Sequence, residues 1–150
     1  VAFEAVHHNR LIGRLEGAGV IGVALQWFRS YLQDRSQFVK MGQFASACKI
    51  VTCGVPQGSS LSPILFNVYI QPLVESLASK HYRVYNYADD AQLILHFYDP
   101  AKAQVQACDI LCFISSWMCR NALKLNPDKT ELLVIGDLWR SGRNSFGLRR

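Results

Sequence analysis

Apolar and polar side chains follow a helical period in the first part of the chain. Residues 8–18 and 21–33 repeat apolar positions every three or four residues, and Gly17-Ala18-Gly19 separates the two stretches. The pattern predicts two helices. The second has a broad apolar face, which consists of Ile21, Val23, Leu25, Trp27, Phe28, Tyr31 and Leu32.

The period changes to two between residues 37 and 41, and such alternation is typical of a strand. Gly42-Gln43 then predicts a turn, because glycine readily adopts turn conformations. Residues 44–52 offer a return strand. This stretch therefore predicts a pair of antiparallel strands.

A loop and a long helix are expected next. Gly54-Val55-Pro56-Gln57-Gly58 has the composition of a loop. Ser62-Pro63 predicts a helix start, because a serine hydroxyl caps the first turn and proline suits the first helical position. We expect this helix to run to about Ser79, with a kink at Pro72.

The second half of the chain predicts a hairpin and a further helix. Residues 82–87 and 92–98 are rich in β-branched and aromatic side chains, and Ala88-Asp89-Asp90-Ala91 lies between them as an acidic tip. Residues 101–122 predict a helix after Asp99-Pro100. A short strand at 123–125, a turn at 126–128 and a return strand at 131–135 are expected to follow.

Length and composition favour one globular domain. The chain has 150 residues, half of them hydrophobic, and mixes helices with antiparallel strands without strict alternation, which predicts the α+β class. We expect the domain to span residues 1–136 and a basic tail to span 137–150. The chain has no apolar run of about 18 residues and no signal-peptide pattern, so a nuclear or cytoplasmic protein without a membrane span is expected.

Charge and cysteine content narrow the class of partner. The formal net charge of +5 favours polyanionic partners. For the basic residues of the tail, the alternative interpretation is a solvated segment without a partner. The five cysteines include no CxxC pair, and their odd number argues against a disulfide scaffold. Cys108, Cys112 and Cys119 share one helical face, where we expect them to be buried as small apolar side chains.

The acidic tip is the strongest candidate for chemistry. Asp89 and Asp90 are adjacent carboxylates that repel each other and add nothing to a core. Strands on both sides make such a tip rigid, and a rigid carboxylate pair suits Mg²⁺, which prefers oxygen ligands in strict geometry. The alternative is an ordinary acidic turn.

Three motifs in order carry a family resemblance. They are Gly54-Val55-Pro56-Gln57-Gly58-Ser59, Tyr87-Ala88-Asp89-Asp90 and the segment from Leu123 to Glu131. This set resembles the reverse transcriptases of LINE-like, non-LTR retrotransposons, and Trp27-Phe28-Arg29-Ser30-Tyr31-Leu32 matches as well. The resemblance implies an RNA-directed DNA polymerase whose partners are an RNA template, a DNA primer and deoxynucleoside triphosphates. The implied fold is the palm of a right-hand polymerase with part of the fingers, an antiparallel sheet packed with helices, and a missing thumb.

The resemblance also implies the metal chemistry. Asp89 is the main ligand from its motif, with Asp90 beside it. In the two-ion scheme one Mg²⁺ lowers the pKa of the primer 3′-hydroxyl, and the other neutralises the triphosphate and the leaving pyrophosphate. The family's first-motif carboxylate stands five residues before Phe3 and would precede Val1, so the two-ion site is incomplete in this chain.

Further roles follow from the same resemblance. Gln57 and Gly58 match the loop that contacts the incoming nucleotide and template, and Lys129 matches a lysine that protonates or neutralises the pyrophosphate. Phe3 matches the steric gate that excludes a ribose 2′-hydroxyl. A plain turn, a solvated lysine and a core phenylalanine are the respective structural alternatives.

Departures from the family pattern leave the activity open. His7 stands where many relatives have aspartate, and Ala91 stands where many have threonine. One interpretation is a reverse transcriptase domain that transfers nucleotides. A second is a catalytically inactive retroelement remnant that binds nucleic acid weakly through its basic residues. The third, disfavoured by the ordered motifs, is an unrelated metal protein with an acidic tip.

Overall fold

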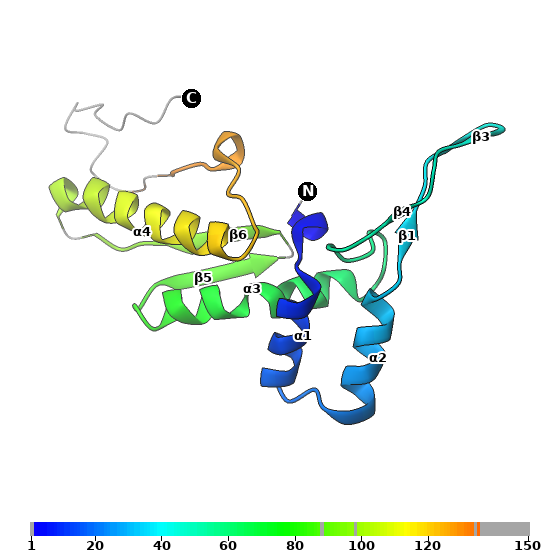
Figure 1. Ribbon diagram of the computed structural model, residues 1–150. Helices are drawn as coiled ribbons and strands as arrows, with labels where there is room; N and C mark the ends of the chain where they lie inside the picture. The colour runs from blue at the N-terminus through cyan, green and yellow to red at the C-terminus, as the bar shows by residue number, and fades with distance from the viewer. Residues whose placement is uncertain (1, 88, 98, 134, 136–150) are drawn as a thin grey trace.

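The computed structural model describes residues 2–87, 89–97, 99–133 and 135, and it has the predicted α+β class (Figure 1). Its helices are α1 (His8–Gly17), α2 (Gly22–Leu32), α3 (Ser62–Ala78) and α4 (Pro100–Arg120), with 3-10 turns η1 (Ala2–Ala5) and η2 (Pro127–Lys129). Its strands are β1 (Ser36–Gln37), β2 (Lys40–Met41), β3 (Phe44–Ala45), β4 (Lys49–Ile50), β5 (Arg83–Tyr87) and β6 (Asp90–Ile94).

Helix α3 is the centre of the main core. Its residues Leu65, Phe66, Tyr69 and Ile70 are buried together with side chains of α1, α2 and the loop before α3. The other buried members of this cluster are Val6, Leu11, Ile12, Leu15, Leu25, Leu32, Val55 and Leu123. The predicted helices at 8–18 and 21–33 are thus confirmed as α1 and α2. Helix α1 packs against both α3 and α2.

A second cluster forms at the far end of α3. Leu73 and Leu77 of α3 pack with Ile110 of α4, and half-buried side chains of the β5–β6 hairpin cover them, including Val84 and Leu93. Because α3 contributes to both clusters, it fixes the hairpin relative to the N-terminal helices. The predicted helices at 62–79 and 101–122 are confirmed with small shifts at their ends.

The stretch between α2 and α3 forms a narrow two-stranded ribbon that reaches away from the body (Figure 1). Strand β1 pairs with β4, and β2 pairs with β3, all antiparallel. The predicted strand pair is confirmed, but it is broken into two short ladders. The turn expected at Gly42-Gln43 is also confirmed, and Gly42 adopts a φ of 60°, in the region that favours glycine.

The β5–β6 hairpin is confirmed with a tighter tip than the sequence predicted. Tyr87 pairs with Asp90, and Asn86 pairs with Ala91. Asp90 therefore begins the second strand instead of belonging to the tip. That strand ends at Ile94, so the expected range of 92–98 is wrong at both ends.

The start of α3 differs from the predicted cap. Ser62 is the first residue of the helix instead of its N-cap, and Leu61 precedes it without a side-chain cap. The buried Ser62 hydroxyl donates instead to the Pro56 carbonyl, which ties the preceding loop to the helix. Proline in the first turn is confirmed, and Pro72 lies inside the helix. The kink expected at Pro72 stays a prediction.

The hairpin predicted at 123–135 is wrong for the described residues. Pro127–Lys129 forms a 3-10 turn, and no strand is assigned at 123–133 or at 135. The Asn126 side chain accepts a hydrogen bond from the Asp128 amide at 3.1 Å, and the Thr130 hydroxyl donates to the Asn126 carbonyl at 2.7 Å. These local bonds satisfy the Asp128 amide and the Asn126 carbonyl without a partner strand.

The prediction of buried thiols is wrong. All five cysteines are free and exposed. Helix α4 turns another stripe inward, in which Ala103, Ala107 and Ile110 are buried and Trp117 is half-buried. Cys108 follows the buried Ala107 by one position, and Cys112 follows the buried Ile110 by two positions. Each step of one residue rotates the side chain by about 100° around the helix, so both thiols are turned away from the buried stripe. They therefore face solvent.

Helix α2 also buries less than its pattern suggests. Leu25 and Leu32 are buried, whereas Val23 is 83% exposed and Trp27 is 52% exposed. Only one edge of the apolar face meets α1 and the core. No helix in the described part of the chain is long and apolar enough to span a membrane.

Arg14 of α1 contacts side chains of both α3 and α4. Its guanidinium carbon lies 4.3 Å from the Tyr69 ring centroid and 5.3 Å from that of Trp117, and Nη2 donates to Asn121 Oδ1 at 2.5 Å. Burial lowers the pKa of Arg14, Tyr69 opposes this shift and Arg10 adds to it. Nη1 is buried and finds no hydrogen-bond partner among the residues described. The two rings therefore supply much of the compensation for this half-buried charge.

Candidate active site

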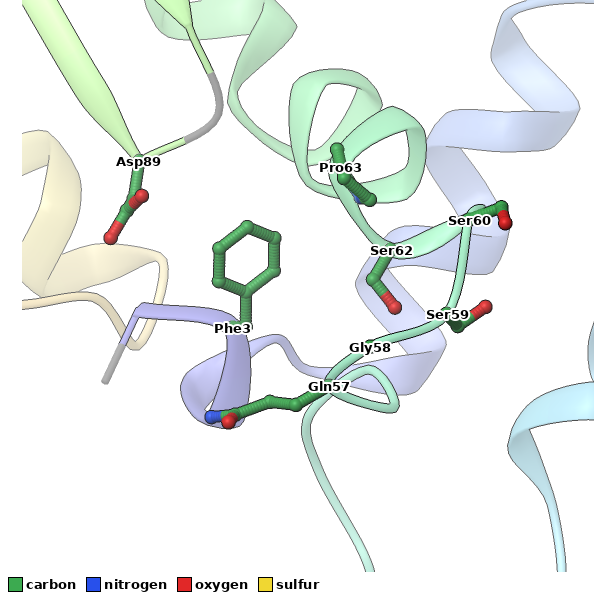
Figure 2. Close-up of a pocket in the computed structure, with 8 residues that line it drawn as sticks. All are labelled: Phe3, Gln57, Gly58, Ser59, Ser60, Ser62, Pro63 and Asp89. Atoms are coloured by element: carbon green, nitrogen blue, oxygen red, sulfur yellow. The ribbon is translucent and has the colours of Figure 1, made fainter.

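An open pocket gathers three segments that lie far apart in the sequence (Figure 2). Phe3 comes from η1, the loop before α3 and the first turn of α3 form one continuous segment, and Asp89 comes from the turn between β5 and β6. The lining residues are Phe3, Gln57, Gly58, Ser59, Ser60, Ser62, Pro63 and Asp89. Four of the predicted site residues, Phe3, Gln57, Gly58 and Asp89, therefore meet in one place.

The two acids of the hairpin occupy different positions. In the view of Figure 2 the Phe3 ring lies between the Asp89 side chain and the serines of the loop before α3. Asp90 is paired with Tyr87 in the first rung of the ladder and does not line the pocket. Both side chains are exposed. Although the two acids are neighbours in the sequence, only the Asp89 carboxylate lines the pocket, and Asp90 belongs to the adjoining strand.

Phe3 forms a wall of the pocket and is half-buried. Its ring packs against Phe66 of α3, with centroids 4.9 Å apart and ring planes at 42°. Phe66 is only 3% exposed. The gate and core interpretations of Phe3 are therefore compatible, since the ring contacts Phe66 of the core and also lines the pocket.

Backbone hydrogen bonds hold η1 against the loop before α3. The Val55 amide donates to the Phe3 carbonyl at 2.9 Å, and the Gly54 amide donates to the Val6 carbonyl at 2.7 Å. His7 and Cys53 form an isolated antiparallel bridge in the same stretch. These bonds fix Phe3 relative to the pocket loop, although about 50 residues separate the two segments.

Gly54 allows this close approach. A Cβ at position 54 would lie 2.9 Å from Glu4 Cα, and the φ of 91° is one that other residues rarely adopt. The Gly54 carbonyl also hydrogen-bonds with His8 Nε2 at 2.7 Å. The motif and the loop composition around Gly54 carry no signal of this close approach.

Gln57 and Gly58 form the lower rim of the pocket in Figure 2. Gln57 Nε2 donates to Glu4 Oε1 at 3.0 Å, so a side chain of η1 holds a side chain of the loop. Gly58 adopts a φ of 79°, and no atom lies within 4 Å of the place where its Cβ would be. The glycine is thus required by its backbone conformation, and the space beside it is open to a ligand.

Helix α2 also contacts the loop before α3, through Tyr31. The Tyr31 hydroxyl donates to Ser59 Oγ at 2.8 Å, and Ser59 Oγ accepts from the Leu61 amide at 3.3 Å. The Tyr31 ring stacks on Trp27, with centroids 5.3 Å apart and planes at 12°. The Trp-Phe-Arg-Ser-Tyr-Leu segment therefore contributes to the site indirectly, through Tyr31.

Lys129 lies elsewhere. It is exposed in η2 and does not line the pocket. Its predicted contact with a pyrophosphate stays a prediction.

The pocket offers few metal ligands of its own. Among the described residues no group of three or more His, Cys, Asp or Glu side chains is placed to hold a metal ion. Mg²⁺ usually binds one or two carboxylates together with substrate phosphates and waters. The exposed Asp89 carboxylate fits that donor chemistry for a Mg²⁺ ion that arrives with a phosphate-bearing ligand.

Two comparisons with known proteins agree with each other. The family model described as reverse transcriptase (RNA-dependent DNA polymerase) matches residues 1–147. The chain is also 31% identical over 137 residues to a protein named "Probable RNA-directed DNA polymerase from transposon BS" of Drosophila melanogaster. That alignment covers 86% of this chain and 15% of the relative, so the chain spans a small part of the relative's length.

Proposed function

This chain belongs to the reverse transcriptase (RNA-dependent DNA polymerase) family, and we propose that it binds the incoming nucleotide in an RNA-directed DNA polymerase of a retrotransposon. The observation that supports this function best is the pocket in which Phe3, Gln57 and Asp89 meet. The proposed substrates are a deoxynucleoside triphosphate, an RNA template and a DNA primer. The reaction is nucleotidyl transfer to the primer 3′-hydroxyl.

The pocket wall formed by Phe3 would select the sugar. An aromatic ring offers no hydrogen-bond partner to a ribose 2′-hydroxyl, and a hydroxyl desolvated without a partner costs about 1–3 kcal/mol. The ring cannot move away easily, because Phe66 packs behind it. A deoxyribose lacks this hydroxyl and is accommodated without that penalty.

The Asp89 side of the pocket would bind the phosphates through a metal ion. Asp89, with Asp90 beside it, would hold Mg²⁺. When bound in a two-ion arrangement, Mg²⁺ neutralises the triphosphate and lowers the pKa of the primer hydroxyl. Lys129 is proposed to neutralise the leaving pyrophosphate.

The larger elements fit a right-hand polymerase in our proposal. Helices α3 and α4 with the β5–β6 hairpin would form the palm, and α2 with the β1–β4 ribbon would belong to the fingers. The domain is proposed to span residues 1–136. The expected basic tail at 137–150 lies outside the described residues.

Equilibrium titration of the chain with nucleotides tests this function. We expect a deoxynucleoside triphosphate to bind in the presence of Mg²⁺, to bind more weakly after chelation, and to bind more tightly than the matching ribonucleoside triphosphate. The inactive-remnant alternative predicts a different result. It predicts salt-sensitive binding of single-stranded nucleic acid without binding of the nucleotide.

A further inference from the structure

We infer, on the basis of that proposed function, that Glu4 is a positioning residue, which orients the Gln57 amide so that its carbonyl oxygen is left to accept a hydrogen bond from the nucleotide. The contact that carries this inference is the 3.0 Å hydrogen bond from Gln57 Nε2 to Glu4 Oε1. Gln57 lines the pocket and Glu4 does not, so Glu4 would act through Gln57.

The backbone of Glu4 is fixed on both sides. Its neighbour Phe3 accepts a hydrogen bond from the Val55 amide at 2.9 Å, and Val6 accepts one from the Gly54 amide at 2.7 Å. Gly54 lies so close to Glu4 that a Cβ there would be 2.9 Å from Glu4 Cα. The carboxylate therefore begins from a rigid point, which reduces the entropy lost when it holds a second side chain.

The polarity of the contact sets the orientation of the amide. An ionised carboxylate accepts hydrogen bonds and donates none, so it can pair with Gln57 only through the NH₂ group. If the amide turned by 180°, its carbonyl oxygen would face the carboxylate, and two acceptors would repel each other. Glu4 therefore removes one of the two orientations that an isolated glutamine side chain adopts freely.

A fixed amide presents a defined set of groups to a ligand. With one N–H held by Glu4, the Gln57 carbonyl oxygen and one further N–H remain for other partners. The chemistry that matches an oriented acceptor is a hydrogen-bond donor, and the 3′-hydroxyl that a deoxynucleoside triphosphate carries on its sugar is such a donor. The Phe3 ring lines the same pocket and offers no competing acceptor.

Two single variants and a control separate orientation from simple packing. Glu4→Gln keeps a group of the same size, but its amide both donates and accepts, so both orientations of Gln57 become populated. Glu4→Leu removes the acceptor. Glu16→Gln makes the same chemical change on an exposed acid of α1 that does not line the pocket. Each protein is titrated with the same deoxynucleoside triphosphate and Mg²⁺.

We expect Glu4→Gln and Glu4→Leu to weaken nucleotide binding about 3- to 10-fold, the loss typical of one hydrogen bond. Glu16→Gln is expected to bind as the unaltered chain does. The side-chain amide resonances of Gln57 in an NMR spectrum report the contact directly. They should shift in both Glu4 variants, while the backbone resonances of α3 stay in place.

A double variant tests the direction of the hydrogen bond. In Glu4→Gln/Gln57→Glu the donor and acceptor exchange places, and the carboxylate introduced at position 57 keeps one oxygen free to face the ligand. Gln57→Glu alone puts two carboxylates in contact and should bind most weakly. Recovery of most of the affinity in the double variant, measured as coupling between the two sites, would support the inference.

Three results would count against it. Wild-type affinity in Glu4→Gln would overturn the role of Glu4 while leaving the proposed function intact. Additive losses in the double variant would overturn the oriented hydrogen bond. If the unaltered chain bound no nucleotide at all, the proposed function and the inference would both fall, even if the Gln57 amide resonances still responded to Glu4.

Discussion

The Phe3 ring rests on the Phe66 ring, with centroids 4.9 Å apart. Phe66 is buried in the core of α3, whereas Phe3 lines the open pocket. The side chain proposed to select the sugar is thus anchored in the hydrophobic core. Its position depends on packing as much as on its own sequence segment.

Shortening the gate should reduce sugar selection. Phe3→Val leaves room beside the pocket, so we expect the preference for deoxyribonucleotides over ribonucleotides to fall by about 5-fold or more, in line with the cost of one desolvated hydroxyl. Titration with both nucleotides measures the ratio. Phe38→Val is the matched control, because Phe38 is 59% exposed on the ribbon and does not line the pocket. An unchanged ratio in Phe3→Val would show that Phe3 is not the gate.

The two acids of the hairpin should differ in their effect. Asp89 lines the pocket and Asp90 is in the β5–β6 ladder, so Asp89→Asn should weaken Mg²⁺-dependent nucleotide binding by at least about tenfold, and Asp90→Asn by less. Mg²⁺ titrations at a fixed nucleotide concentration measure both. Equal losses in the two variants would contradict the asymmetry of the site.

Gly54 should be the more sensitive of two glycines with positive φ. Gly54→Ala places a Cβ 2.9 Å from the Glu4 backbone, whereas Gly58→Ala meets nothing within 4 Å. Both substitutions carry the strain of positive φ, about 1–2 kcal/mol. We expect Gly54→Ala to lower the free energy of unfolding by roughly 1–3 kcal/mol more than Gly58→Ala does. Urea denaturation followed by circular dichroism makes the comparison, and similar losses would argue against a tight η1–loop contact.

Removal of the Arg14 guanidinium should loosen the packing of α1, α3 and α4. Arg14→Ala loses the contacts with Tyr69 and Trp117 and the hydrogen bond to Asn121, partly offset by relief of a buried charge. We expect a loss of about 2 kcal/mol in the free energy of unfolding. Arg10→Ala, at an exposed position of α1, should cost less than about 1 kcal/mol. The reverse order in urea denaturation would contradict this role of Arg14.

The exposed thiols should react in the folded state. Because all five cysteines are free and exposed, a colourimetric thiol reagent should modify five per chain without denaturant. Reaction that requires unfolding would restore the expectation of buried thiols.

Local sequence patterns were sufficient for most of the elements. Helices α1, α3 and α4, and the hairpin that carries Asp89, follow from periodicity and from turn residues that act within a few positions. The candidate site residues Phe3, Gln57, Gly58 and Asp89 were also identified from motifs. Periodicity, turn residues and motifs can be recognised from the sequence because the residues that form each of them are neighbours in the chain.

Burial could not be determined in the same way. The cysteine face of α4 and the face of α2 around Val23 have the composition of core surfaces, yet both are exposed. A helix with apolar residues on several sides contains no local information about which side its neighbours will cover. At residues 123–133 the expected strands are absent from the described residues, and a 3-10 turn capped by the Asn126 side chain stands in their place. The period of apolar residues does not indicate such side-chain-to-backbone hydrogen bonds, which compete with strand pairing.

The sequence by itself thus determined the family motifs, the α+β class and the residues that could take part in the site. Only the tertiary structure decided that Gly54 packs on Glu4, that Glu4 holds Gln57, and that Asp89 lines the pocket while Asp90 does not. The physical reason is the range of the forces involved. Helices and turns are set by bonds between residues a few positions apart, whereas these contacts join segments about 50 or more residues apart and form only when the core around α3 packs.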